Sequence, residues 1–158
     1  MRIFLLLAIF AFDGFASEQP NCSLDEPYTG KLFELEIKTS FSGKYVFEFC
    51  LDSRAYLLSE YHEPIRLTKS VRSTIVNESK VKLPDSSAHK IRELYAQART
   101  NLKSDSTRGM DGATWCFRPK DGMSYSETCI WSPQVDTISR GHEKLVELGE
   151  YLYEVSTF

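Results

Sequence analysis

The sequence predicts an α+β fold in which a mainly antiparallel sheet and two helices form a two-layer sandwich. Two pairs of segments alternate apolar and polar residues and are joined by short turns, which is typical of antiparallel hairpins. Two further segments carry apolar residues at helical spacing. Because each element has one apolar face, helices packed on one side of the sheet would bury these faces together. The regular strand and helix alternation of a parallel sheet is absent from the sequence.

The first hairpin follows from two runs with a two-residue period. Residues 33–38 place phenylalanine, leucine and isoleucine on one face and charged residues on the other. After a turn over residues 40–43, the second run places its aromatic residues and Leu51 on one face. The two segments are therefore expected to pair as neighbouring strands.

The pattern is weaker between residues 52 and 83, where short runs predict strands over 55–61, 65–71 and 81–83. Pro64 predicts a break or an edge position between the first two. The sequence at 84–86 is a helix-start signal, and the spacing that follows it predicts a helix over about residues 86–102. The apolar residues at that spacing are Ile91, Leu94, Tyr95, Ala98 and Leu102.

A second hairpin is expected from the strand-like runs 113–118 and 124–131, joined through the turn dipeptide Asp121-Gly122. Pro133 ends this hairpin. Leucine and valine residues then recur at i, i+3, i+7 and i+10, which predicts a terminal helix. These residues are Leu145, Leu148, Leu152 and Val155.

The amino terminus has the three parts of a secretory signal peptide. Arg2 precedes the apolar run 3–12, and Gly14 and Ala16 place small side chains where a signal peptidase reads them. The apolar run is about half of the roughly 20 residues that a membrane-spanning helix needs. We therefore expect cleavage after Ala16, a periplasmic or secreted protein, and no membrane span after signal cleavage.

The predicted organisation is a signal peptide over 1–16, an irregular lead-in over 17–30 and a single α+β domain over 31–158. Cleavage removes one charge of each sign, so the mature chain keeps the net charge of -3. No nucleic-acid partner is expected from this balance. An acidic protein would instead suit a protein partner of basic character.

Four cysteines lie downstream of the cleavage site, and an even number in an exported chain favours disulfides over free thiols. We favour Cys22 with Cys50 and Cys116 with Cys129, although four cysteines allow three connectivities. If the second hairpin turns at Gly122-Met123, the latter two cysteines lie directly opposite each other. If it turns at Asp121-Gly122, Cys116 faces Glu127 unless a bulge restores the match.

The sequence contains no complete catalytic motif that we recognise, and no catalytic, cofactor-binding or metal-binding residue is assigned. His142-Glu143 begins like a zinc-protease helix, but the second histidine is replaced by Val146. The chain also lacks a nucleophile elbow, a phosphate-binding glycine loop and a dinucleotide fingerprint. The cysteines lack the Cys-x-x-Cys spacing of redox and zinc sites.

Three residues of the second hairpin region are weak candidates for a surface site. Asp111 precedes the first strand, where it could act as an acid or base or could simply hydrogen-bond its own turn. Trp115 and Trp131 lie near the outer ends of the hairpin, where they could form a platform for carbohydrate or peptide. Packing is the more frequent role of such large aromatic residues.

The same region resembles a set of uncharacterised exported bacterial proteins. The resemblance rests on Asp111-Gly112-x-x-Trp115, then Tyr125, then Trp131-Ser132-Pro133 and a leucine-rich closing helix. It implies export and this fold but no activity, since the set is a domain of unknown function. The similar proteins usually lack cysteines in this hairpin, which implies that a disulfide there is an additional cross-link on which the shared pattern does not depend.

The leading functional hypothesis is an exported non-enzymatic protein-binding module, such as an inhibitor or an immunity protein in the periplasm. It rests on a small acidic domain with disulfides and no catalytic signature. The first alternative is a small envelope hydrolase that acts on glycan or peptide, with Asp111 or Glu63 as acid and base. The second is a structural component of the envelope. Oligomeric state is left open by the sequence.

Overall fold

The computed structural model describes residues 30–51, 54–64, 75–121 and 124–157. These residues form seven strands and three helices. The strands are β1 (Lys31–Thr39), β2 (Lys44–Leu51), β3 (Ala55–His62), β4 (Ile75–Lys82), β5 (Ala113–Asp121), β6 (Ser124–Tyr125) and β7 (Thr128–Trp131). The helices are α1 (Asp85–Asn101), α2 (Thr137–Arg140) and α3 (Glu143–Val155).

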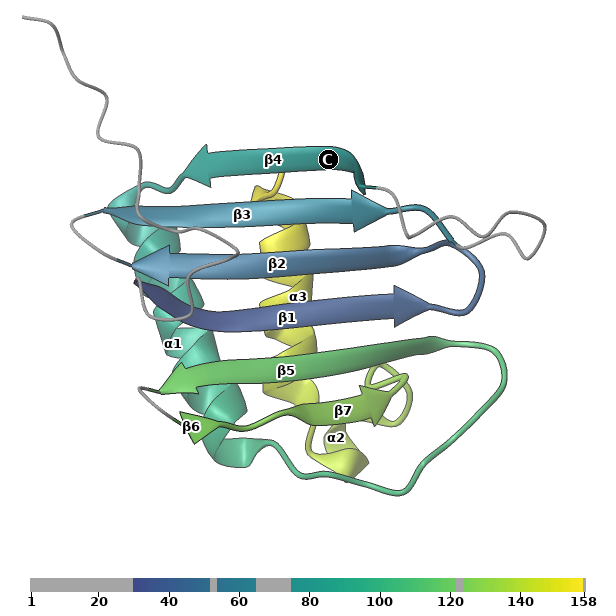
Figure 1. Cartoon of the computed structure of the whole chain (residues 1–158). Helices are drawn as coiled ribbons and strands as arrows, with labels where there is room; N and C mark the ends of the chain where they lie inside the picture. Colours follow the sequence, from purple (N-terminus) through teal and green to yellow (C-terminus); the bar gives the residue numbers. More distant parts are fainter. Residues whose placement is uncertain (1–29, 52–53, 65–74, 122–123, 158) are drawn as a thin grey trace, which may run out of the picture.

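The strands form one sheet in the order β4-β3-β2-β1-β5-β6, and β7 also pairs with β5. Every described strand pair is antiparallel. Helices α1 and α3 lie side by side across one face of this sheet (Figure 1). The predicted α+β fold with a mainly antiparallel sheet is therefore confirmed.

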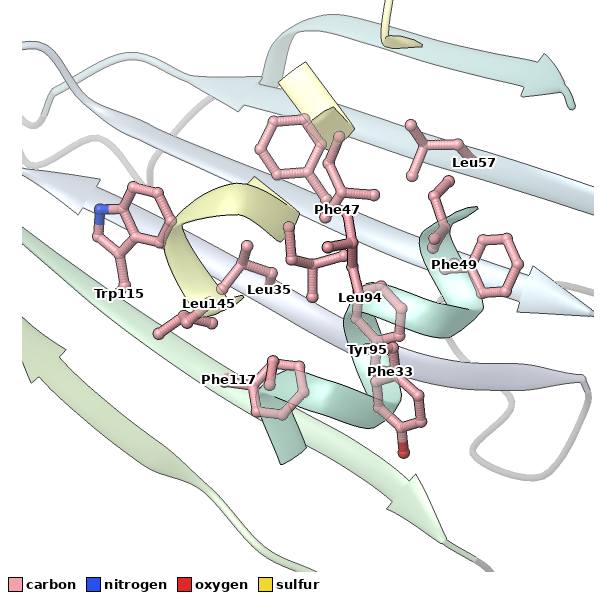
Figure 2. Close-up of a cluster of buried hydrophobic side chains, with 14 of the residues drawn as sticks. Phe33, Leu35, Phe47, Phe49, Leu57, Leu94, Tyr95, Trp115, Phe117 and Leu145 are labelled. Atoms are coloured by element: carbon pink, nitrogen blue, oxygen red, sulfur yellow. The ribbon is translucent and has the colours of Figure 1, made fainter. Parts of the chain in front are cut away.

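The main hydrophobic core lies between the sheet and the two long helices (Figure 2). Phe33 at its centre stacks on Tyr95 of α1, with ring centroids 5.0 Å apart, and on Phe49 of the neighbouring strand. Trp115 packs against α3 at Gly149, where a Cβ atom would lie only 2.2 Å from the indole ring. Burial of these large side chains is the main source of stability for a domain of this size.

The first hairpin has the predicted faces and turn, since Phe33, Leu35, Phe47 and Phe49 are all fully buried toward the helices. The helix predicted over 86–102 is α1, and the predicted terminal helix is α3. A strand predicted near 55–61 is β3.

Three details differ from the sequence predictions. The strand expected over 81–83 is the end of β4, which begins six residues earlier. The strand expected over 124–131 is divided into β6 and β7. The short helix α2 was not anticipated, because four residues are too few to show a helical period. The strand predicted over 65–71 lies outside the described residues.

The register of the second hairpin decides between the two turns that the sequence allowed. Asp121 pairs with Ser124 and Lys120 pairs with Tyr125, so the strands close around positions 122 and 123. The same register continues to Cys116 and Cys129, which lie directly opposite each other and form a disulfide. The predicted Cys116–Cys129 pairing is confirmed, and no bulge is needed to form it.

Cys50 is also bonded in a disulfide. The predicted pairing of Cys50 with Cys22 lies outside the described residues, as do the predicted signal peptide and almost all of the predicted lead-in. None of the described helices is both long and apolar enough to cross a membrane.

Candidate interaction surface

One end of the sheet brings together three connections that are far apart in the sequence. They are the β1–β2 turn at residues 40–43, the end of β3 at residues 62–64, and the approach to β5 at residues 109–112. We call this group of residues the turn end, and Figure 1 shows the β1–β2 turn, the end of β3 and the start of β5 at the same side of the sheet. Its hydrogen bonds and exposed side chains distinguish it from the rest of the described surface.

Hydrogen bonds fix the β1–β2 turn. The backbone N–H and the hydroxyl of Thr39 both donate to the carbonyl of Gly43, each at 2.9 Å. The hydroxyl of Tyr61 on β3 donates to the carbonyl of Ser42 at 2.7 Å. Gly43 has a φ of 95°, and a Cβ atom there would lie 2.2 Å from the carbonyl oxygen of His62, so only glycine fits.

Further hydrogen bonds join this turn to the chain that leads into β5. The N–H of Ser40 donates to the carbonyl of Gly112 at 2.9 Å. The hydroxyl of Ser40 lies 3.1 Å from the carbonyl oxygen of Met110 and 3.0 Å from that of Gly112. It also accepts the N–H of Gly112 at 3.2 Å. Two connections separated by some 70 positions in the chain are thus held as one unit.

Two large apolar side chains project from this hydrogen-bonded unit into solvent. Phe41 is 74% exposed and Met110 is 92% exposed. Among the described residues, the other exposed large apolar side chains are Val135, Ile138 and Tyr153, which lie on α3 or in and beside α2. An exposed aromatic residue and an exposed methionine on neighbouring, ordered connections are a feature of protein-binding surfaces.

A hollow of about 390 Å³ lies at the turn end, on the sheet face opposite the helices. We call it the charged hollow. Its lining residues come from β1, β2, β3 and the adjoining turns: Glu36, Lys38, Thr39, Ser40, Gly43, Lys44, His62, Glu63 and Pro64. A volume of this size is within the range of small-ligand and side-chain sites in proteins.

The strand register explains why this hollow is charged. Lys38 is paired with Lys44, and Lys44 is paired with His62, so three basic side chains form a row across three strands. Lys44 has a carboxylate partner in Glu36, at 3.7 Å. Within the described part of the chain, Lys38 makes no ion pair, and neither does Glu63. These two opposite charges are therefore available to a partner.

His62, the third member of this row, is bonded to the carboxylate of Glu60 on the same strand. Its Nε2 lies 2.8 Å from Oε2 of Glu60, and both residues are more than nine-tenths buried. Among the residues that the structure describes, none bonds to the other ring nitrogen of His62 or to the other carboxylate oxygen of Glu60. A buried histidine held by a carboxylate can orient a ring for acid–base chemistry, and it can equally fix a strand end.

The remainder of this sheet face carries a network of ion pairs. Arg118 of β5 bonds to Glu34 on β1 and to Glu127, and Lys31 bonds to Glu48. Burial raises the pKa of Glu48, an effect that the Lys31 ammonium opposes. Such paired charges join neighbouring strands of the sheet.

The three predicted surface-site residues are in different environments. Asp111 is exposed in the turn end, and its carboxylate makes neither the turn hydrogen bond considered from the sequence nor another bond to a described residue. Trp115 is only 4% exposed and belongs to the core. Trp131 is partly buried against Gly109 and Gly112, where a Cβ atom would lie 2.0 Å and 3.0 Å from its ring. The two tryptophans therefore do not form a common platform.

The Asp-Gly pair before β5 has a packing role. A Cβ atom at Gly112 would lie 2.2 Å from the hydroxyl of Ser132, in addition to its contact with Trp131. The hydroxyl of Ser132 accepts the N–H of Ala113 at 3.3 Å, next to Gly112. Glycine at position 112 thus permits the segment with the Asp-Gly-x-x-Trp motif to pack closely against the segment with the Trp-Ser-Pro motif.

A partly buried polar cluster that no sequence pattern indicated fixes the path from α1 to the turn end. Asp105 accepts hydrogen bonds from Arg140 at 2.8 Å and from His142 at 3.1 Å. The hydrogen bond from Arg140 holds the pKa of Asp105 well below its usual value, and the bond from His142 acts in the same direction. Arg140 also donates to the carbonyls of Trp131, Ser132 and Val135. Two residues near α2 therefore anchor the loop that leads to Met110.

The described metal-ligand geometry is limited to one group, Cys116, Glu127 and Cys129. Both sulfur atoms in this group are bonded to each other in the disulfide. A disulfide sulfur lacks the thiolate charge that binds metal ions. The group therefore does not constitute a metal site in the oxidised protein.

Three comparisons with known proteins gave no relative for this chain: neither a family model, nor a curated protein, nor a solved structure matches it. The functional argument consequently rests on the residues and geometry described above.

Proposed function

We propose that the chain is an exported, non-enzymatic module that binds another protein through the turn end, and that it serves as an inhibitor or immunity protein in the periplasm. The observation that carries this proposal is the exposure of Phe41 and Met110 on two connections that are hydrogen-bonded to each other. Most other large apolar side chains in the described residues are buried in the core or packed against it.

The physical advantage of this arrangement is preorganisation. Binding normally loses free energy because flexible loops and side chains must become ordered at the interface. Hydrogen bonds from Thr39, Ser40 and Tyr61 already order the connections that carry Phe41 and Met110. Full burial of one such side chain is worth about 1.5 to 3 kcal/mol, so the pair could supply the anchor of an interface.

Charges support a partner of basic character. The whole chain has a net charge of -3. The outer face of α3 adds a stripe of carboxylates at i, i+4, i+7 and i+11: Glu143, Glu147, Glu150 and Glu154. Lys144 neutralises part of this stripe by bonding to Glu147. Charges of this kind accelerate the approach of a basic protein, whereas the apolar anchors determine how long it stays bound.

Export is supported by the amino-terminal sequence and by the disulfide between Cys116 and Cys129. Disulfides persist in the periplasm and outside the cell, and they are rare in reducing compartments. Intact-mass analysis of the protein recovered from the envelope tests this part of the proposal. The mature chain is expected to begin at Ser17.

A capture experiment with matched variants tests the binding role. The full chain carries a carboxyl-terminal tag, is purified from a bacterial host without reductant, and is incubated with envelope and culture extracts. The test variant is Phe41→Asp combined with Met110→Asp, and the control is Ile138→Asp, because Ile138 is 81% exposed outside the turn end. A stoichiometric protein held by wild type and control but lost by the double variant supports the proposal; equal recovery by all three contradicts it.

The charged hollow supports a second candidate, a small envelope hydrolase acting on glycan or peptide. Glu36, Glu63 and His62 line the same hollow, and two carboxylates or a carboxylate and a histidine can act as acid and base. Incubation with cell-wall fragments and with peptides tests this role. Product formation that Glu63→Gln abolishes would favour the hydrolase, whereas the absence of turnover by wild type would remove it.

A further inference from the structure

The two edges of the described sheet differ in length and continuity. At one edge, β6 has two residues and β7 has four, so the outer row beside β5 is short and interrupted. At the other edge, β4 has eight residues and contains no proline. Figure 1 shows no described strand or helix beyond β4 in the plane of the sheet. A long edge strand offers unpaired backbone N–H and C=O groups to another strand.

The two residues of β4 next to Ser79 carry opposite charges. Glu78 and Lys80 flank it and are exposed on the sheet face opposite the helices, as their pairing with Glu60 and Leu58 of β3 shows. The side chain of Ser79 points to the helix face, where its hydroxyl lies 2.6 Å from that of Thr157. The face opposite the helices therefore presents Glu78 and Lys80 at equal distances from Ser79, followed by the exposed Lys82, which pairs with Tyr56 of β3.

This pattern is complementary to itself in one antiparallel register. If two copies of β4 pair about a two-fold axis through Ser79, Glu78 of each copy lies opposite Lys80 of the partner subunit. Moving the axis to position 78 places Glu78 opposite Glu78 of the partner subunit. Moving it to position 80 places Lys80 opposite Lys80 of the partner subunit, although Glu78 then lies opposite Lys82 of the partner subunit. Opposite charges across strands stabilise a pair, and like charges destabilise it.

We propose that the chain forms a two-fold homodimer in which β4 pairs antiparallel with β4 of a second copy, centred on Ser79. The two sheets then form one continuous sheet, and in each copy α1 and α3 keep their position against their own half of it. The interface uses the edge of β4 rather than the turn end, so each copy keeps Phe41 and Met110 free for a partner protein. A symmetric dimer with the same surface on both subunits is the commonest form of protein oligomer.

The contact is small, because it consists of one strand pair and two charge pairs. The dimer is therefore expected to dissociate on dilution within the range of about 1 µM to about 1 mM. Sedimentation velocity of the mature, oxidised protein over this range measures the dissociation constant. Wild type is expected to change from monomer to dimer as its concentration rises.

Charge reversal tests the register. Glu78→Lys and Lys80→Glu, each made singly, turn both cross-subunit pairs into like-charge contacts and are expected to weaken the dimer by about tenfold or more. The double variant restores opposite charges and is expected to dimerise like wild type. An equimolar mixture of the two single variants is also expected to form a heterodimer, because each variant then complements the other. Lys103→Glu makes the same charge change away from β4 and serves as control.

Thermal unfolding of every variant verifies that these exposed substitutions leave the fold intact. A wild-type protein that is monomeric throughout the concentration range would overturn the proposal. So would a dimer that the single reversals leave unchanged, or a mixture of the two single variants that associates no better than either one alone. Restoration by both the double variant and the mixture would establish the pairing of Glu78 with Lys80 of the partner subunit.

Discussion

Removal of the Cys116–Cys129 disulfide should reduce stability while leaving the fold intact. The bond joins directly opposed residues of β5 and β7 that are separated by 13 positions in the chain. Closing a loop of this length restricts the unfolded chain and stabilises the native state by about 3 kcal/mol in the chain-entropy model. The variant to test is Cys116→Ala combined with Cys129→Ala, which keeps the remaining cysteines.

The expected result is a loss of about 3 kcal/mol in the free energy of unfolding and a decrease of about 10 °C in Tm. Urea titration followed by circular dichroism measures the first quantity, and calorimetry measures the second. Native pairing should survive, because Lys120 with Tyr125 and Asp121 with Ser124 preserve the same register without the bond. Unchanged stability would refute the claim that the disulfide stabilises the protein by restricting the unfolded chain. Complete loss of structure would refute the view that the hairpin forms without the bond.

Three further predictions follow from the packing and charges. Asp105→Asn removes the charge that accepts hydrogen bonds from Arg140 and His142, so it should lower stability by about 1 to 2 kcal/mol at pH 7. Folding lowers the pKa of Asp105, so the ionised carboxylate stabilises the folded state above pH 3.8, its pKa in the unfolded chain, and this contribution is lost progressively as the pH falls below that value. Urea titrations should therefore show a smaller stability difference between variant and wild type at pH 3 than at pH 7. Gly112→Ala places a methyl group against Ser132 and should lower stability by about 1 to 3 kcal/mol in the same assay, and an unchanged unfolding midpoint would contradict that packing. Peptide mapping of the unreduced protein should recover a peptide that joins Cys22 to Cys50, whereas recovery of a free Cys22 thiol would rule this pairing out.

The sequence predicts the strands that bury one face, but of β4, whose exposed residues are mainly polar, it predicts only the end. In β2, the aromatic residues and Leu51 fall on every second position, because that face meets the helices. In β4, the described side chains between Asn77 and Lys80 are all polar, so the two-residue period gives no signal there. Edge strands often have this composition, because one of their sides has no neighbouring strand.

The register of the second hairpin could be narrowed but not decided from the sequence. Asp121-Gly122 is a common turn dipeptide, and it competed with the pairing of Cys116 and Cys129. In the structure the cysteine pairing and the strand register agree, and Asp121 is the last residue of β5. A covalent bond and a strand register shared by β6 and β7 therefore outweigh the local preference of one dipeptide.

The candidate interaction surface depends on contacts that no local pattern reveals. Phe41 lies within a predicted turn, and Met110 lies between the predicted helix and the second predicted hairpin. Two large apolar residues outside the predicted strands and helices are the one sequence signal that could have identified them. Their proximity arises from the hydrogen bonds of Ser40 with Met110 and Gly112, some 70 positions away. Likewise, Asp105 meets His142 only because α1 and α3 pack side by side.

Site-specific photo-crosslinking in living cells tests the proposed binding surface most directly. A photoreactive amino acid is placed singly at position 41, 110 or 138 of the full chain, and the adducts in the envelope fraction are resolved after illumination. Positions 41 and 110 are expected to give the same discrete adduct with one protein, and position 138 none, although Ile138 is 81% exposed. No adduct at either position in the turn end, or the same adduct at all three positions, would contradict the assignment of the turn end as the binding surface.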